Sequence, residues 1–268
     1  MTEGTVDRRT LIGGFVTAVA TSGLAGAACA QSAPKTFVLV HGAFLGGWCW
    51  RRVSDRLAES GHKVFSLTLS GLGERSHLLS NSVNFDTHVA DIVNVIKWEG
   101  LNDICLVVHS YGGAPGSGAL DQIGDRVSSI VWLDAFKPKN GERMMDLSPV
   151  FGKLVQGAID KGEAGFAPAS FKMTTAAVNE RDVDLFASKA TPQPIGTYTQ
   201  PMKLSGAIEQ VAKKTYIRLP KYPNPNFDKA LSECKADNSW STVEIADCGH
   251  VAMLDIPQQL TELLIKAA

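Results

Sequence analysis

Ser110 is the residue of this chain best suited to act as a nucleophile. An apolar run from Ile104 to Val108 predicts a buried strand before it, and a segment rich in glycine and alanine follows at 112–119. A serine at the apex of a sharp strand-to-helix turn forms a nucleophile elbow, usually written G-x-S-x-G. The turn exposes the hydroxyl at a helix N-terminus. Gly112 keeps this turn tight. Val108 replaces the first glycine, and its branched side chain is expected to crowd the packing of strand and helix.

His250 is the predicted general base. A serine hydroxyl needs a histidine to take its proton, a carboxylate to orient that histidine, and N–H donors for the oxyanion. In a strand–helix architecture with a nucleophile elbow, these groups follow in the order serine, acid, histidine. The sequence Asp247-Cys248-Gly249-His250 comes directly after the last predicted strand. His250 therefore stands where the base is expected, whereas the other histidines have plainer explanations in strands, helices and loops.

Asp134 is the predicted acid. The acid usually follows the strand before last, here ending at Leu219, but residues 220–226 contain no carboxylate. Asp134 directly follows a predicted strand at 128–133, on the sheet edge where open α/β sheets place their chemistry. A structural role in capping the next turn is the alternative for Asp134. The other open possibilities are Asp228, Asp247, Asp255, or a site without an acid.

Two backbone N–H groups are predicted to stabilise the oxyanion. One belongs to Tyr111, the residue after the nucleophile, and the other to Ala43, in the loop after the first predicted strand. The preceding His41-Gly42 pair keeps that loop tight enough for the backbone to approach a substrate.

An alternation of strands and helices must position these residues. Strands are predicted at 36–40, 62–69, 104–108, 128–133, 215–219 and 242–245, and helices at 48–58, 85–96 and 254–264. Asn84 is a plausible N-cap for the second helix. This order predicts an α/β fold, with a mostly parallel sheet and helices on both faces. The segment from about 137 to 201 breaks the alternation with prolines and short amphipathic pieces, and is predicted to form a cap over a binding pocket.

The first thirty residues are predicted to be an export signal. Arg8-Arg9 precede a weakly apolar run, and Ala28-Cys29-Ala30 has the form of a cleavage site. The paired arginines indicate the twin-arginine type. The mature domain would be 31–268, periplasmic or secreted, with no stable membrane anchor after cleavage. A membrane anchor, or lipidation of Cys29, is the alternative.

The composition of the chain limits which classes of binding partner it can have. The chain has 268 residues, 44% of them hydrophobic, and a formal net charge of −1, which fits one globular domain. No basic excess indicates nucleic acid. No Cys/His spacing indicates a metal, and nothing suggests a cofactor or fixes the oligomeric state. Cys234 and Cys248 are predicted to be free buried thiols, with a disulfide between them as the alternative.

From Thr36 to its C-terminus the sequence resembles the α/β-hydrolase superfamily. More narrowly, it resembles the small-esterase branch that contains plant methyl esterases, hydroxynitrile lyases and their bacterial esterase relatives. The resemblance rests on V-L-V-H-G-A-F-L-G-G-W-C-W from Val38, H-S-Y-G-G from His109, T-P-Q-P from Thr191, and C-G-H from Cys248. It implies Ser110 as nucleophile, His250 as base, and Ala43 and Tyr111 as oxyanion donors. The plant members carry their acid after the strand that here ends at Leu219, so Asp134 would be a relocated acid.

The sequence therefore predicts a serine hydrolase that cleaves a small, largely apolar carboxylic or carbamate ester through an acyl-Ser110 intermediate. A lyase on the same scaffold is one alternative. Hydroxynitrile lyases of this branch have a threonine and a lysine where this chain has Gly42 and Val251. Epoxide hydrolases and dehalogenases of the superfamily have an aspartate at the elbow, unlike Ser110. A ligand-binding protein with little turnover is the remaining alternative.

Overall fold

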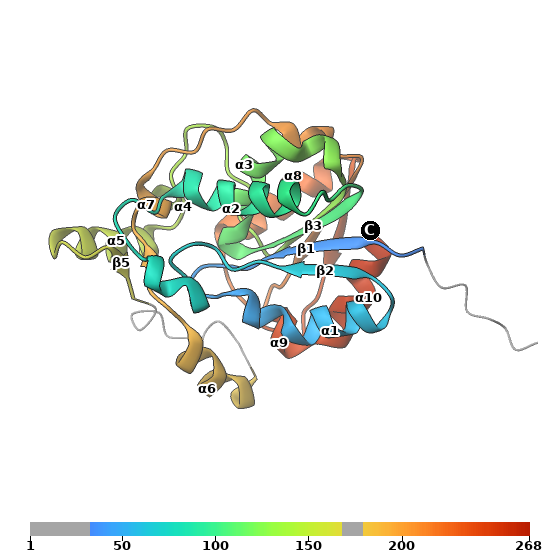
Figure 1. Ribbon diagram of the computed structural model, residues 1–268, viewed down its shortest axis with the longest axis horizontal. Helices are drawn as coiled ribbons and strands as arrows, with labels where there is room; N and C mark the ends of the chain where they lie inside the picture. The colour runs from blue at the N-terminus through green and yellow to red at the C-terminus, as the bar shows by residue number, and fades with distance from the viewer. Residues whose placement is uncertain (1–32, 168–178) are drawn as a thin grey trace, which may run out of the picture. The chain divides into compact units, whose positions relative to one another are not determined.

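A computed structural model describes residues 33–167 and 179–268 (Figure 1). The predicted export signal, 1–30, lies outside the described residues. From Pro34 to Ala268 the chain forms one compact unit.

A parallel sheet of six strands is the centre of this unit, in the order β2-β1-β3-β4-β7-β8. The strands are β1 (Thr36–Val40), β2 (Lys63–Ser66), β3 (Ile104–His109), β4 (Val127–Leu133), β7 (Lys213–Arg218) and β8 (Trp240–Glu244). From β1 the chain first builds outward through β2 and then returns to the other side of β1 with β3. The strand order therefore reverses between β1 and β3, and such switch points form ligand crevices in open α/β sheets.

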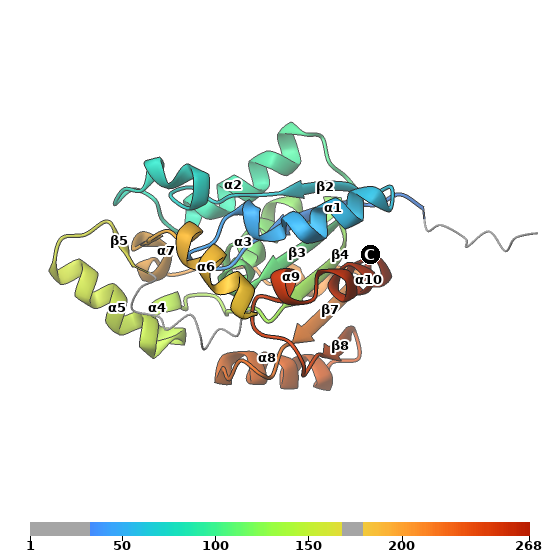
Figure 2. The same cartoon turned by 90° about the horizontal axis from the view of Figure 1, so that it is seen from below.

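Helices cover both faces of the sheet, as the sequence predicted (Figures 1 and 2). On one face lie α1 (Arg51–Glu59), α9 (Ala252–Asp255) and α10 (Pro257–Ala267), and on the other α2 (Phe85–Trp98), α3 (Gly113–Ile123) and α8 (Pro225–Ala236). Successive side chains of β1 point to opposite faces of the sheet. Phe37 and Leu39 pack into the core under α1 and α10, and Val38 and Val40 pack into the core under α2 and α3. Both cores exclude water, so the inner strands β1, β3 and β4 are largely apolar on both faces, whereas the edge strands β2 and β8 are only partly buried.

Most differences from the predicted elements are at their ends. The predicted closing helix is divided in two, because Pro257 disfavours helical backbone at Ile256, which has φ −133° and ψ 50°. The first helix begins at Arg51, after a 3-10 turn from Gly47 to Trp50. Asn84 caps α2 as predicted: its side chain accepts from the Thr87 N–H, and the Thr87 hydroxyl accepts from the Asn84 N–H.

The long segment between β4 and β7 is built of short elements. They are α4 (Met144–Leu147), α5 (Pro149–Asp160), β5 (Gly165–Phe166), α6 (Glu180–Lys189), β6 (Gln193–Pro194) and α7 (Gly196–Thr199). The sequence did not predict the small antiparallel pair of β5 and β6. Residues 168–178 of the predicted cap lie outside the description.

Cys234 and Cys248 are both buried free thiols, and so are Cys49 and Cys105. The alternative of a disulfide between Cys234 and Cys248 was wrong. Across 33–167 and 179–268, no helix combines the length and apolar character that crossing a membrane requires.

Candidate active site

The sheet register places Ser110 and Asp134 next to each other. His109 pairs with Leu133, so the two residues that follow these leave neighbouring strands at the same level. The Asp134 N–H donates to the carbonyl of Ile217 in β7 (2.7 Å), which extends the strand pairing by one residue. All six strands are parallel, so the loops that follow them share one edge of the sheet. The structure thus brings the predicted nucleophile and the predicted acid to the same edge.

The backbone at this edge is unusual. Four described residues other than glycine have positive φ, and three of them belong to this edge: Ser110 (53°), Asp134 (45°) and Phe44 (67°). Left-handed backbone is unfavourable for residues with a Cβ and is concentrated at functional sites. At Ser110 this conformation forms the sharp elbow that the sequence predicted. A Cβ on Gly112 would lie 2.7 Å from the carbonyl oxygen of His41, so the elbow approaches the loop after β1 too closely for any other residue.

Val108 does not crowd the elbow, contrary to the prediction. Its side chain is fully buried between β3 and α3. It faces Gly116, where an added Cβ would lie only 2.7 Å from Val108 Cγ1. The glycine that the motif lacks in the strand is thus replaced by one in the facing helix, which leaves room for the branched side chain.

Asp134 and His250 form a direct hydrogen bond. Nδ1 of His250 lies 2.7 Å from Oδ2 of Asp134, and the carboxylate is completely buried. The Nδ1–H therefore donates to the acid, which leaves Nε2 as the basic nitrogen of the imidazole. Asp134 thus lies where a carboxylate must be to orient His250, the predicted base.

The second oxygen of Asp134 contacts a residue that the sequence analysis missed. Its Oδ1 accepts from Nη1 of Arg218 (2.7 Å) and from the Leu219 N–H (3.1 Å). Arg218 is only 1% exposed and also donates to Oδ1 of Asp228. Burial alone lowers the pKa of Arg218, but the two carboxylates outweigh burial and keep the pKa above its ordinary value. A charged guanidinium therefore compensates the buried carboxylate.

The structure does not bring the alternative acids to His250 Nδ1. Asp228 pairs with Arg218. Asp255 accepts from the Gly249 N–H (2.9 Å) and so holds the loop that carries His250. Asp247 is exposed.

Aromatic rings fix the orientation of His250. Tyr222 stacks on the imidazole with ring centroids 4.3 Å apart and an interplanar angle of 22°. On the backbone, the Nε2–H of His109 donates to the His250 carbonyl (2.8 Å). The sequence alone does not reveal either support, because a loop tyrosine carries no motif and the His109–His250 contact joins residues 141 positions apart.

The oxyanion loop is held by two buried side chains, His41 and Gln193, and by one backbone N–H. Leu69 donates its N–H to Nε2 of His41, so His41 must donate from Nδ1 to the Gly42 carbonyl (2.7 Å). Burial lowers the pKa of His41 to about 4, which keeps it neutral in this role at neutral pH. Further along, Gln193 accepts from the Phe44 N–H (3.2 Å) and Thr191 donates its N–H to the Phe44 carbonyl (3.0 Å). The T-P-Q-P segment therefore clamps the loop that carries Ala43.

The two predicted oxyanion donors are available. Tyr111 belongs to the first turn after the elbow, whose N–H groups have no acceptor within the helix. Within the described residues, the Ala43 N–H has no hydrogen-bond acceptor either.

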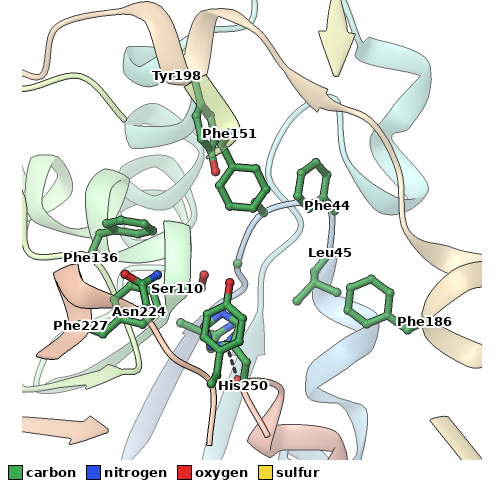
Figure 3. Close-up of a pocket in the computed structure, with 14 residues that line it drawn as sticks. Phe44, Leu45, Ser110, Phe136, Phe151, Phe186, Tyr198, Asn224, Phe227 and His250 are labelled. Atoms are coloured by element: carbon green, nitrogen blue, oxygen red, sulfur yellow. Dashed lines mark hydrogen bonds between the residues drawn. The ribbon is translucent and has the colours of Figure 1, made fainter. Parts of the chain in front are cut away.

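A largely aromatic pocket opens over Ser110 and His250 (Figure 3). It encloses about 480 Å³ including its open mouth. The aromatic lining consists of Phe44, Phe136, Phe151, Phe186, Tyr198, Tyr222 and Phe227. Three of these, Phe151, Phe186 and Tyr198, come from the segment of about 137–201 that the sequence predicted as a cap. Such walls favour flat, apolar ligands. In the described part of the chain, no cluster of His, Cys, Asp or Glu has the geometry to hold a metal ion.

Known proteins resemble this chain over most of its length. Residues 37–263 match the alpha/beta hydrolase family. A carbendazim hydrolyzing esterase from Nocardioides sp. (strain SG-4G) is 34% identical over 238 residues, covering 85% of this chain and 97% of that protein. Methylesterase 10 from Arabidopsis thaliana is 26% identical over 261 residues, covering 87% and 91%. These relatives confirm the predicted resemblance to plant methyl esterases and bacterial esterases.

Solved structures give the same fold. An extracellular alpha/beta-hydrolase from a Paenibacillus species superposes with a TM-score of 0.77 at 24% identity, covering 88% of this chain and 99% of that one. The predicted fold class is confirmed.

Proposed function

The chain belongs to the alpha/beta hydrolase family, and from that premise we propose that it is a carboxylic-ester hydrolase with Ser110 as nucleophile, His250 as base and Asp134 as acid. The observation that carries the proposal is the 2.7 Å hydrogen bond between His250 Nδ1 and buried Asp134, next to a strained Ser110 in the same pocket. The esterase relatives support the reaction class.

The reaction would proceed in two halves. His250 Nε2 takes the Ser110 proton as the serine oxygen attacks the ester carbonyl, and the N–H groups of Ala43 and Tyr111 receive the oxyanion. His250 then protonates the leaving alcohol, and an acyl-Ser110 ester remains. A water that gives its proton to the same nitrogen hydrolyses this intermediate and restores the serine. Throughout, Asp134 stabilises the imidazolium form of His250.

The proposed substrate is a small, largely apolar carboxylic or carbamate ester. Phenylalanine and tyrosine rings make up half of the lining residues, whereas Ser110, His250 and Asn224 lie together at one end (Figure 3). This arrangement suits an ester group held at the polar end and an apolar body held between the rings.

The decisive experiment compares three proteins on a series of short-chain nitrophenyl esters. Asp134→Asn should lower kcat by about 10⁴-fold, because the amide no longer holds the imidazole in its productive tautomer. Asp228→Asn is the matched control, and should keep most of the rate because Asp228 contacts only Arg218 among the groups of the site. Near-ultraviolet circular dichroism checks that both variants are folded.

A fluorophosphonate probe tests the nucleophile separately. The folded protein should become labelled at Ser110, and Ser110→Ala should not. If the folded wild type resists labelling and hydrolyses no ester, the hydrolase proposal is wrong. If Asp134→Asn keeps most of its rate, Asp134 is structural and the triad assignment is wrong.

A further inference from the structure

The hydroxyl of Tyr198 is a buried polar group without a partner. Tyr198 is fully buried, and among the described residues its Oη has no hydrogen-bond partner. Buried tyrosine hydroxyls are nearly always hydrogen-bonded, since an unpaired one loses its interaction with water and gains nothing in return. The side chain nevertheless lines the pocket over Ser110. An unpaired group in that position is where a ligand would supply the missing hydrogen bond.

The direction of this hydroxyl is fixed. The Tyr198 ring stacks on Tyr111, with centroids 5.6 Å apart and an interplanar angle of 12°, and meets the Phe166 ring edge-on at 4.9 Å. Its N–H donates to the Ile195 carbonyl (2.9 Å). The side-chain amide of Gln193 donates to the hydroxyl of the preceding residue, Thr197, and its oxygen accepts from the Phe44 N–H. The tyrosine is thus rigidly connected to the oxyanion loop.

Tyr198 lies away from the groups that would carry out the reaction. In Figure 3 its hydroxyl points inward from one end of the pocket, whereas Ser110, Asn224 and His250 gather at the other. The labelled rings of Phe44, Phe136 and Phe151 surround the space between them. A ligand that reaches both ends therefore needs a flat apolar body with polar groups at its two extremities.

We propose that the Tyr198 hydroxyl is a specificity subsite that binds a ring heteroatom, or another neutral hydrogen-bonding atom, at the end of an aromatic ester remote from its scissile carbonyl. This inference rests on the proposed function, and it narrows the substrate from an apolar ester to a heteroaromatic one. A site built to bond a polar atom discriminates strongly against the analogue that lacks it, because its own buried group then stays unpaired.

The chemistry of the hydroxyl limits the atom that it binds. Burial raises the pKa of Tyr198 well above its ordinary value, so the group remains a neutral O–H that donates and accepts. A ring nitrogen, a ring N–H or a carbonyl would satisfy it. A charged atom would lose its hydration among aromatic rings without a counter-ion, so the subsite favours neutral esters.

The test combines one change in the protein, Tyr198→Phe, with one change in the substrate, the replacement of a ring C–H by nitrogen. Naphthyl acetate is compared with quinolinyl acetates in which a single C–H of the distal ring is replaced by nitrogen, on the wild type and on Tyr198→Phe. For at least one nitrogen position, the wild type should favour the quinolinyl ester by about tenfold in kcat/KM, the value of one hydrogen bond. Tyr198→Phe should abolish this preference, so that kcat/KM for the quinolinyl ester no longer exceeds that for the naphthyl ester.

A thermal melt separates a ligand subsite from a structural tyrosine. Tyr198→Phe should raise Tm by about 2–4 °C, because it removes an unpaired buried hydroxyl. Tyr216→Phe is the matched control: its hydroxyl donates to the Ala135 carbonyl (2.9 Å), so its loss should lower Tm and leave the preference for nitrogen intact.

Two results would overturn the subsite: no nitrogen position is preferred by the wild type, or Tyr198→Phe keeps the preference. If no ester is hydrolysed, the proposed function fails, but the subsite is still tested by calorimetric binding of quinoline and naphthalene to the wild type and to Tyr198→Phe. Tighter binding of quinoline that depends on Tyr198 would then support the subsite alone, and equal binding would refute it.

Discussion

Asp134 has a different partner on each of its oxygens. Oδ2 accepts from His250 and Oδ1 from Arg218, and both the carboxylate and the guanidinium are almost completely buried. Removing one member of a buried ion pair leaves the other charge without compensation, which is far more harmful than never having had the pair. The orientation of His250, the proposed base, therefore depends on an arginine for which no contact with Ser110 or His250 is seen.

Replacing Arg218 should destabilise the fold. Arg218→Met should lower the free energy of unfolding by about 3–5 kcal/mol, because it leaves Asp134 buried and unpaired. Asp228→Asn should change it by no more than about 1 kcal/mol, because the Asp228 side chain is 62% exposed. Urea denaturation at pH 7 measures both. Equal losses in the two variants would mean that the exposed pair, and not the buried one, stabilises this edge.

The sequence indicated the proposed triad residues better than the residues that support them. Ser110 and His250 follow from local motifs, and Asp134 from its place directly after a strand. Arg218 lies 84 residues from Asp134, and Gln193 lies 149 residues from Phe44. Such contacts are set by how the strands and the segment between β4 and β7 pack in three dimensions. No spacing in one sequence encodes them.

At the scale of elements, β3 and α3 pack together because a large residue in the strand faces a small residue in the helix. The elbow motif usually carries its small residue in the strand, whereas here Val108 fills that position and Gly116 of the helix faces it. The branched side chain at 108 is therefore compatible with the elbow only because residue 116 is a glycine.

A double-mutant cycle tests this complementarity. Gly116→Ala should lower the free energy of unfolding by about 1–3 kcal/mol, since the new methyl group would overlap Val108. In a Val108→Ala background the same change should be much less harmful, with a coupling of about 1–2 kcal/mol. Chemical denaturation of the four proteins gives the coupling. Purely additive effects would show that the two side chains do not compete for space.

The elements themselves were largely predictable, and their ends were not. Apolar runs located β3 and β4, because strands buried on both faces contain few polar residues. The edge strands β2 and β8 are only partly buried, yet they too overlap predicted strands. The predicted bounds were wrong where a single residue determines the end of an element, as at Pro257, which divides the last helix. The sequence also failed to indicate the β5–β6 pair, whose strands of two residues are too short to show any periodicity.

At the scale of the whole molecule, the region around the site is built on neutral buried histidines. Burial lowers the pKa of His41 and of His88 to about 4, and lowers that of His109 well below its ordinary value. His88 shows the pattern: Nε2 donates to the Ser70 carbonyl (2.8 Å) and Nδ1 accepts from the Tyr111 hydroxyl (3.0 Å). Protonation would turn that acceptor into a donor and place a charge inside the core.

Stability should therefore fall in mild acid. Between pH 6.5 and about 4 the unfolded chain protonates His88 and the folded chain does not. The free energy of unfolding thus decreases as the pH falls through this window, by about 1.4 kcal/mol per pH unit and per such histidine. His88→Gln keeps a donor and an acceptor but does not titrate, so its stability should depend less steeply on pH by about one proton. Urea midpoints from pH 7 to 4.5 measure the slopes, and equal slopes would contradict this assignment.

The position of Asp134 has a consequence for how the enzyme can change. Because Asp134, directly after β4, supplies the carboxylate that bonds to His250, the loop at 220–226 after β7 does not have to supply one. It contributes Tyr222 and Asn224 to the pocket wall, and its three prolines limit its conformations. The proposed orientation of His250 and the shape of the pocket wall thus depend on separate loops. A library randomised at Asn224 and its exposed neighbours would explore new substrates while the Asp134–His250 pair stays intact, which makes this loop the natural starting point for redesign.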